Sequence, residues 1–316
     1  MKNPIMAAIT AVTMSTLAAT AAFAETRITY KSSKAGSAYY QMGVELAEAM
    51  KAGTDGQVIV TLEESQGSVQ NVMEVRARGA DYVFTTPPAL ISLAQGGKAM
   101  FEGKGNPAFD EIRALFPIPS LTMHFVMSAE SGVTDLMGLE GKTILLGKGS
   151  FGANEGKAYL DLFGLADKVK IADAESSNAV AALKNGQIDG FVTAGSYPEP
   201  KVIEAAASMS ITVLSLSDDQ VAATKRTKLT IPAGTYTGQE EDVVTTSLPV
   251  VAYALSAMDD DTAYALTKTF WENKAKLGST APWWNGVDQS FMSNIQGEIH
   301  PGAIRYYEEA GISLAN

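Results

Sequence analysis

Short apolar runs alternate along the chain with stretches in which apolar residues recur at helical spacing, a pattern typical of alternating strands and helices. The first pair is a strand at 28–31, a turn of small residues at 32–37, and a helix that continues to residue 50. The same order recurs at 143–162. Such a turn presents unpaired backbone N–H groups at the positive end of a helix, so we expect both turns to suit a carboxylate or a phosphate.

A longer unit, made of a strand, a polar turn, a helix, a link containing Gly and Asp, and a second strand, occurs twice. The first copy spans residues 57–86 and the second spans 170–193. Two copies of this unit predict two similar domains, each built on a mainly parallel sheet. Ligands of such sheets bind at the carboxyl ends of the strands. We therefore expect the two small-residue turns to face each other across a cleft and to hold a small anionic molecule.

An extended segment with two prolines, residues 113–127, separates the two copies and is interpreted as the crossover between domains. The return crossing is expected within residues 211–250. We therefore predict that lobe 1 comprises residues 25–121 together with about 215–316, and that lobe 2 comprises residues 122–214.

The N-terminus has the features of a secretory signal. Lys2 precedes an uncharged run at 4–23, which closes with an Ala-Phe-Ala cleavage site before Glu25. We expect cleavage after Ala24 and export to the periplasm. A retained membrane anchor is the alternative, and the serines and threonines within the run disfavour it.

Charge and cysteine content exclude several classes of protein. The chain has 24 Lys and Arg against 35 Asp and Glu, a net charge of −11, and this acidic balance argues against a nucleic-acid partner. With no cysteine, the chain has no disulfide scaffold, thiol nucleophile or thiolate metal site. Oligomeric state leaves no signature in the sequence, and we expect a monomer.

Catalytic and metal motifs are mostly missing. The two histidines, His124 in an apolar run and His300 in a Gly/Pro turn, are interpreted as structural. Three aspartates at 259–261 precede a helix predicted at about 262–277, where they would cap it; a calcium cluster is the alternative. We predict no enzyme activity, no catalytic residue, no metal and no cofactor.

One nucleotide-type motif does occur. Gly147–Gly152 matches G-x-G-x-x-G between a predicted strand and a predicted helix, and Asp173 follows near the end of the next strand. One interpretation is an exported enzyme that binds a phosphate-bearing cofactor here. We favour a general anion-binding turn, because an exported protein meets little nicotinamide cofactor.

Four motifs resemble the TAXI-type solute receptors of TRAP transporters, and together they extend over the mature chain. They are IPAGTYTGQEEDV at 231–243, GSAYY at 36–40, ESQGSVQN at 64–71 and HPGAIRYY at 300–307. The resemblance implies an α/β periplasmic binding protein fold, type II-like, in which two lobes with mainly parallel sheets flanked by helices are joined by a hinge. It also implies a receptor that captures a small carboxylate, of dicarboxylate, amino-acid or 2-oxoacid type, and delivers it to the membrane subunits of a TRAP permease. Delivery to an ATP-driven importer or a sensor kinase stays open.

Motif matching carries ligand contacts onto both turns. The candidate ligand-binding residues are Ser37, Tyr39, Tyr40, Ser65, Ser68, Asn71, Thr86, Ser150, Phe151, Gly152 and Tyr197. Of the adjacent Tyr39 and Tyr40, we expect one to contact ligand and the other to pack in the core. Phe151 departs from the family, which commonly has glycine there, and it indicates a ligand with an apolar portion or a shorter chain. The family's glutamine and serine near Thr86 and Pro87 are also absent.

Overall fold

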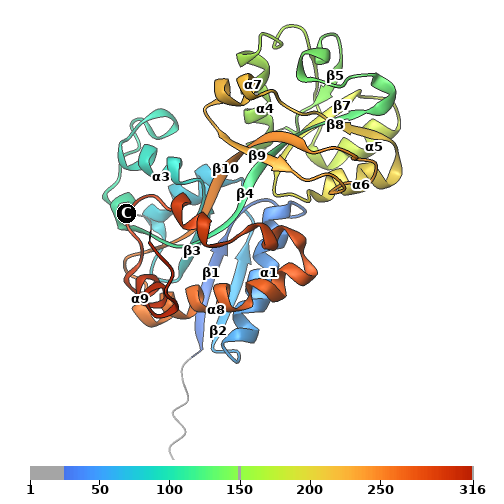
Figure 1. The fold of residues 1–316 in the computed structure, drawn as a ribbon. Helices are drawn as coiled ribbons and strands as arrows, with labels where there is room; N and C mark the ends of the chain where they lie inside the picture. The colour runs from blue at the N-terminus through green and yellow to red at the C-terminus, as the bar shows by residue number, and fades with distance from the viewer. Residues whose placement is uncertain (1–24, 149–150, 315–316) are drawn as a thin grey trace, which may run out of the picture.

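The computed structural model describes residues 25–148 and 151–314, and the chain forms two α/β lobes joined by two long strands (Figure 1). These strands are β4 (Ile112–Ser128) and β10 (Val243–Leu255), which run antiparallel to each other through both lobes. The extended crossover predicted from the sequence therefore corresponds to β4. The predicted signal segment and Ser150 lie outside the described residues.

Lobe 1 has a three-stranded parallel arrangement with helices on both faces (Figure 1). Its elements are β1 (Thr26–Lys31), α1 (Ala38–Gly53), β2 (Val58–Glu63), α2 (Ser68–Glu74), β3 (Tyr82–Thr86), α3 (Pro88–Gln95), α8 (Asp260–Thr280) and α9 (Pro301–Ala310). Lobe 2 repeats the plan with β5 (Thr143–Leu145), α4 (Phe151–Leu162), β6 (Lys170–Ala172), α5 (Ala179–Lys184), β7 (Gly190–Gly195), α6 (Pro200–Ser208), β8 (Ile211–Val213), α7 (Asp218–Thr224) and β9 (Thr227–Ile231).

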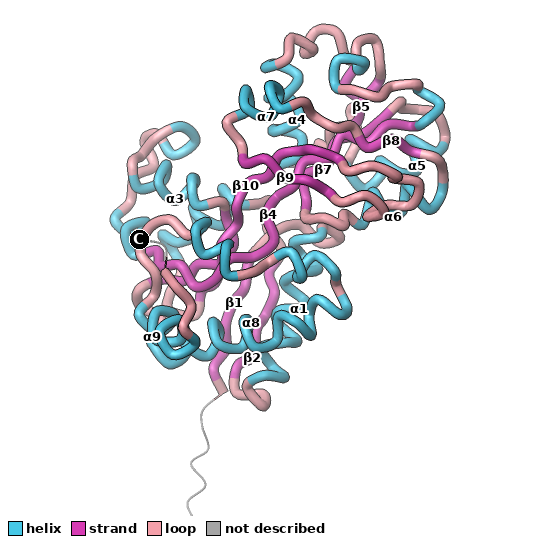
Figure 2. The backbone as a smooth tube through the Cα atoms, viewed as in Figure 1, coloured by secondary structure: helices cyan, strands magenta, loops and turns pink. Residues whose placement is uncertain are grey.

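The ten strands of the described residues belong to one hydrogen-bonded sheet, which continues from one lobe to the other (Figure 2). The strand order is β2-β1-β3-β10-β4-β7-β5-β6, with β8 on β4 and β9 on β10. Pairs within β1–β3 and within β5–β7 are parallel, whereas β4 and β10 pair antiparallel with their neighbours. The predicted fold class is confirmed, and the two mainly parallel sheets are fused by the crossing strands.

The segment after β8 packs on lobe 2. Ile231, Tyr236 and Val243 are buried in one cluster with Val126 and Phe191 of lobe 2. β9 pairs with β10 only at Val243 to Ser247, whereas β10 pairs with β3 of lobe 1 from Val251 onward. We therefore propose that the chain returns to lobe 1 within β10, near residues 247–250, and not at about residue 215.

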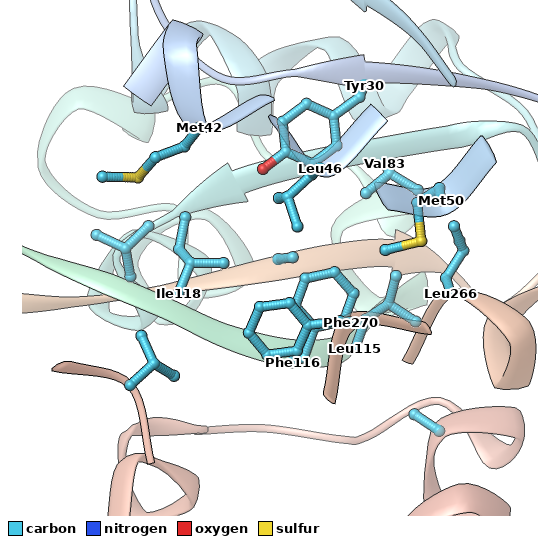
Figure 3. Close-up of a cluster of buried hydrophobic side chains, with 14 of the residues drawn as sticks. Tyr30, Met42, Leu46, Met50, Val83, Leu115, Phe116, Ile118, Leu266 and Phe270 are labelled. Atoms are coloured by element: carbon cyan, nitrogen blue, oxygen red, sulfur yellow. The ribbon is translucent and has the colours of Figure 1, made fainter. Parts of the chain in front are cut away.

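The core of lobe 1 fixes α1 against the sheet (Figure 3). Met42, Leu46 and Met50 lie on one helix face and are at most 2% exposed. Beneath them Phe116 of β4 stacks on Phe270 of α8 with ring centroids 4.3 Å apart. Full burial stabilises each such side chain by about 1.5–3 kcal/mol relative to exposure. The start of α1 is thereby held in one place at the carboxyl end of the sheet.

Asp259 caps α8, and Asp260 and Asp261 lie in the first turn of this helix. The Asp259 side chain accepts the backbone N–H of Thr262 at 2.9 Å, and the helix begins one residue later, at Asp260. The predicted capping role is confirmed. Within residues 25–148 and 151–314, no helix combines the length and apolarity that crossing a bilayer requires.

Candidate functional site

A cleft of about 280 Å³ opens between the two lobes at the carboxyl ends of their parallel strands. Lobe 1 contributes the turn 32–37 and Thr85 at the end of β3. Lobe 2 contributes Lys148 and the end of β7, and Leu121 and Val250 of the crossing strands also line the cleft. The two small-residue turns that the sequence singled out thus border one cleft.

Ser37 organises the lobe 1 turn. It is the N-cap of α1, and its hydroxyl accepts the N–H of Tyr40 at 3.2 Å while donating to the carbonyl of Lys34 at 2.7 Å. The hydroxyl proton is therefore already used. Of the first N–H groups of the helix, those of Ala38 and Tyr39 have no partner in the helix itself, and both residues line the cleft.

Asn71 and Ser65 lie behind the cleft wall and support it. Asn71 is fully buried and donates to the carbonyls of Ser32 at 2.8 Å and Thr85 at 2.9 Å, which ties the ends of β1 and β3 together. The Ser65 hydroxyl bonds to the Asn71 side chain and accepts the N–H of Gly67 at 2.9 Å. Of the three predicted residues in the motif at 64–71, Ser68 is the one that lines the cleft.

The predicted aromatic and threonine contacts divide between the cleft and its surroundings. Tyr39 lines the cleft, and its hydroxyl donates to the carbonyl of Pro119 at 2.5 Å. Tyr40 and Tyr197 are half-buried and are not among the cleft-lining residues. Thr86 is fully buried, whereas Thr85 lines the cleft, because successive side chains of a strand point to opposite faces.

The lobe 2 turn brings Lys148, Phe151 and Gly152 to the cleft. Gly152 permits a close approach, since a Cβ there would lie 2.9 Å from the backbone nitrogen of Ala194 in β7. The start of α4 is thus packed directly against the end of β7. Asp173, which a nucleotide fingerprint would use, makes an exposed ion pair with Lys148 at 3.1 Å.

Glu199 is a cleft residue that the sequence analysis missed. It occupies the N-cap position of α6, is 2% exposed, and its Oε2 has no hydrogen-bond partner among the described residues. Burial raises the pKa of its carboxyl to about 7, while the ammonium and backbone N–H of Lys201 act in the opposite direction. The signal that could have found it is the Tyr-Pro-Glu-Pro sequence at 197–200, a helix start directly after a strand.

Tyr236, in the motif at 231–243, supports Glu199 from behind the cleft wall. The Tyr236 hydroxyl accepts the backbone N–H of Glu199 at 2.9 Å and lies 2.8 Å from Nε2 of His124. His124 is fully buried, and burial lowers its pKa to about 4, so it stays neutral near neutral pH. His300 is also buried and caps α9. Both histidines therefore have the structural roles predicted for them.

The charges around the cleft favour an anion. Among the described residues that line it are three lysines, Lys34, Lys148 and Lys201, and two glutamates, Glu175 and Glu199. Because the pKa of Glu199 is about 7, its carboxyl is partly protonated near neutral pH. The cleft is thus locally positive in a protein whose net charge is −11. No group of three or more His, Asp or Glu side chains within residues 25–148 and 151–314 could hold a metal ion.

Comparison with known proteins gives a family and a fold. Residues 32–311 match the NMT1-like family. The chain belongs to the NMT1-like family. Among solved structures, this NMT1-like protein is similar to the periplasmic binding protein BugD, with 11% identity over 92% of this chain and 99% of that one, at a TM-score of 0.53.

A second likeness is to MatC from Rhodopseudomonas palustris with bound malate, with 10% identity over 82% of this chain and 88% of that one, at a TM-score of 0.53. At these identities the likenesses concern the fold. The NMT1-like protein has the two-lobed α/β fold of periplasmic solute-binding proteins.

Proposed function

We propose that this NMT1-like protein is an extracytoplasmic solute receptor that binds a small organic anion in the interlobe cleft and delivers it to a TRAP-type permease. The observation that carries the proposal is the convergence of α1 and α4 on one cleft, each from its own lobe and each with its N-terminal turn at the wall. Helix N-termini attract anions through their free N–H groups and their dipole. The three lysines add to the attraction.

Hydrogen bonds from helix N–H groups and lysine ammonium groups to an anion suit reversible capture of a ligand. A charge-assisted hydrogen bond contributes about 1.5–3 kcal/mol, and micromolar binding corresponds to about −8 kcal/mol. A few such bonds can therefore give micromolar affinity after ordering costs. The roles of Ser37, Tyr39, Ser68, Phe151 and Gly152 as ligand contacts belong to this proposal, as does the role of the Ser150 turn.

The crossing strands provide a hinge. The register of β10 on β4 shifts between Leu248 and Val250, next to Pro249. Proline lacks a backbone N–H, so the ladder is weakened at the point where the chain passes between lobes. Bending there would open and close the cleft around the ligand while the parallel strands of each lobe move as a unit.

A thermal-shift screen of dicarboxylates, amino acids, 2-oxoacids and monocarboxylates tests binding. A ligand present at about 100-fold its dissociation constant stabilises the folded protein by about 2.7 kcal/mol, so a hit raises the melting temperature clearly. No response to any small acid would contradict the proposal. Uptake into proteoliposomes driven by an ion gradient, and not by ATP, would identify the TRAP route; the TAXI-like signature at 231–243 supports that route.

The exported-enzyme alternative rests on the turn at Gly147–Gly152, which follows β5 and leads into α4. Nucleotide absorbance carried by the purified protein would favour this alternative, and its absence would favour the receptor. Periplasmic location and a monomeric state also belong to the proposal. They are checked by fractionation and by light scattering.

A further inference from the structure

Phe151 stands between two hollows of the molecule. On one side it lines the ligand cleft, and on the other it lines a small hollow near the hinge, formed mainly by α4, β4 and β10. That hollow is too tight to hold a water molecule. Although Phe151 begins α4 of lobe 2, its side chain packs against the buried cluster of lobe 1, to which Leu121 belongs. Its ring, together with Leu121, which also lines both, therefore lies between the cleft and the hollow.

An arginine lies on the far side of this ring. Arg226 lines the hinge hollow and forms a two-point ion pair with Glu155, with Nη2 to Oε1 at 2.9 Å and Nε to Oε2 at 3.2 Å. Arginine binds carboxylates through such paired hydrogen bonds. The described residues that line the ligand cleft include lysines but no arginine. A second carboxylate on a ligand would thus have to pass Phe151 to reach this guanidinium.

Part of the cleft lining is apolar. Leu121, Val192 and Val250 line the cleft and are at most 8% exposed, and the Phe151 ring adds a further apolar wall. An apolar group placed here gains from leaving water. A carboxylate placed here would lose its hydration without a charged partner, which is unfavourable.

We propose that the cleft selects a compact monoanion with an apolar body, a branched or aromatic monocarboxylate, and that Phe151 sets the ligand length by closing the way to Arg226. This inference rests on the proposed receptor function and names the class of ligand. The carboxylate lies at the turns of α1 and α4, and the apolar body lies on the floor made by Leu121, Val192 and Val250.

Isothermal titration with matched acids tests the selectivity of the wild-type protein. The series pairs branched or aromatic monocarboxylates with linear dicarboxylates of the same number of heavy atoms. We expect the best monocarboxylate to bind about ten-fold or more tightly than its matched dicarboxylate, since one unpartnered charge is worth at least this factor. Equal or tighter binding of the dicarboxylates would overturn the inference while leaving the receptor function intact. Failure of every acid to bind would overturn both.

The Phe151→Ala variant tests whether the ring closes the way from the cleft to Arg226. We expect this variant to bind the preferred monocarboxylate about ten-fold or more weakly, because a ring contact is lost, and to bind longer dicarboxylates more tightly than the wild type. Adding Glu155→Gln frees Arg226 and should increase dicarboxylate affinity further. Adding Arg226→Gln to Phe151→Ala should remove the gain.

Phe163→Ala is the matched control. Phe163 directly follows the last residue of α4, is half-buried, packs in the lobe 2 core against Tyr159, and does not line the cleft. It should lower stability without changing the ratio of monocarboxylate to dicarboxylate affinity. Circular dichroism confirms folding of each variant. An unchanged ratio of monocarboxylate to dicarboxylate affinity in folded Phe151→Ala, or the same change of this ratio in Phe163→Ala, would contradict the role proposed for Phe151.

Discussion

Replacing Glu199 by glutamine removes a buried carboxyl group from the cleft wall while keeping the size and shape of the side chain. The wild-type carboxyl is 2% exposed, and burial raises its pKa from 4.5 to about 7. Charged and titratable groups near it are the Lys201 ammonium and the hydroxyls of Tyr39 and Tyr236. Burial also raises the pKa values of the two tyrosine hydroxyls. These tyrosines therefore stay neutral between pH 4 and pH 8, about the range of the test.

The direction of the effect follows from proton linkage. The folded protein takes up a proton at Glu199 more readily than the unfolded chain does, so stability is fully present below pH 4.5 and is lost as the pH rises through about 7. The difference between the two pKa values corresponds to about 3 kcal/mol. Glu199→Gln should thus match the wild type near pH 4 and exceed its free energy of unfolding by up to about 3 kcal/mol near pH 8.

Urea unfolding of both proteins at several pH values measures this difference. Burial lowers the pKa of His124 to about 4, so its contribution is lost as the pH falls from its ordinary value of 6.5 toward 4. This contribution is common to both proteins and cancels in the difference. Glu175→Gln, at an exposed position of the same cleft, is the control and should shift stability by no more than about 0.5 kcal/mol at any pH. A Glu199→Gln effect that is the same at pH 4 and pH 8 would refute the reasoning.

Two further substitutions test how the turns are held. Asn71→Ala should lower the free energy of unfolding by about 3 kcal/mol, because it leaves the carbonyls of Ser32 and Thr85 buried without their donor. Urea unfolding measures this loss, and a loss near zero would contradict the role of Asn71 in joining the ends of β1 and β3. Gly152→Ala should displace the start of α4 from Ala194, which lowers the free energy of unfolding by about 1–3 kcal/mol and weakens ligand binding. Titration calorimetry measures the affinity, and an unchanged affinity in the folded variant would argue against α4 as part of the site.

Local sequence patterns predicted most elements and both turns. Strands and helices followed from apolar periodicity, and the capping aspartates before α8 followed from their position. The single fused sheet did not follow, nor did the place within residues 211–250 at which we propose the return crossing. They depend on which strands pair, and β9 is joined to β10 and lobe 2 by contacts that no local pattern encodes.

The candidate site was predictable only in part for the same reason. Ser37 and Ser68 were candidates through the motifs at 36–40 and 64–71, which are short and local, and the structure brings both to the cleft with Phe151. Asn71 belongs to such a motif, yet its side chain reaches back to the strand ends. Glu199 was missed, because the Tyr-Pro-Glu-Pro sequence marks a helix start after a strand but does not indicate that folding buries the glutamate in the cleft wall.

A crystal structure of the protein, purified with any ligand that it retains, tests the central claim most directly. The account predicts ligand density in the interlobe cleft, with a carboxylate within hydrogen-bond distance of the turns that begin α1 and α4. Ligand density confined to one lobe, or located outside this cleft, would contradict it.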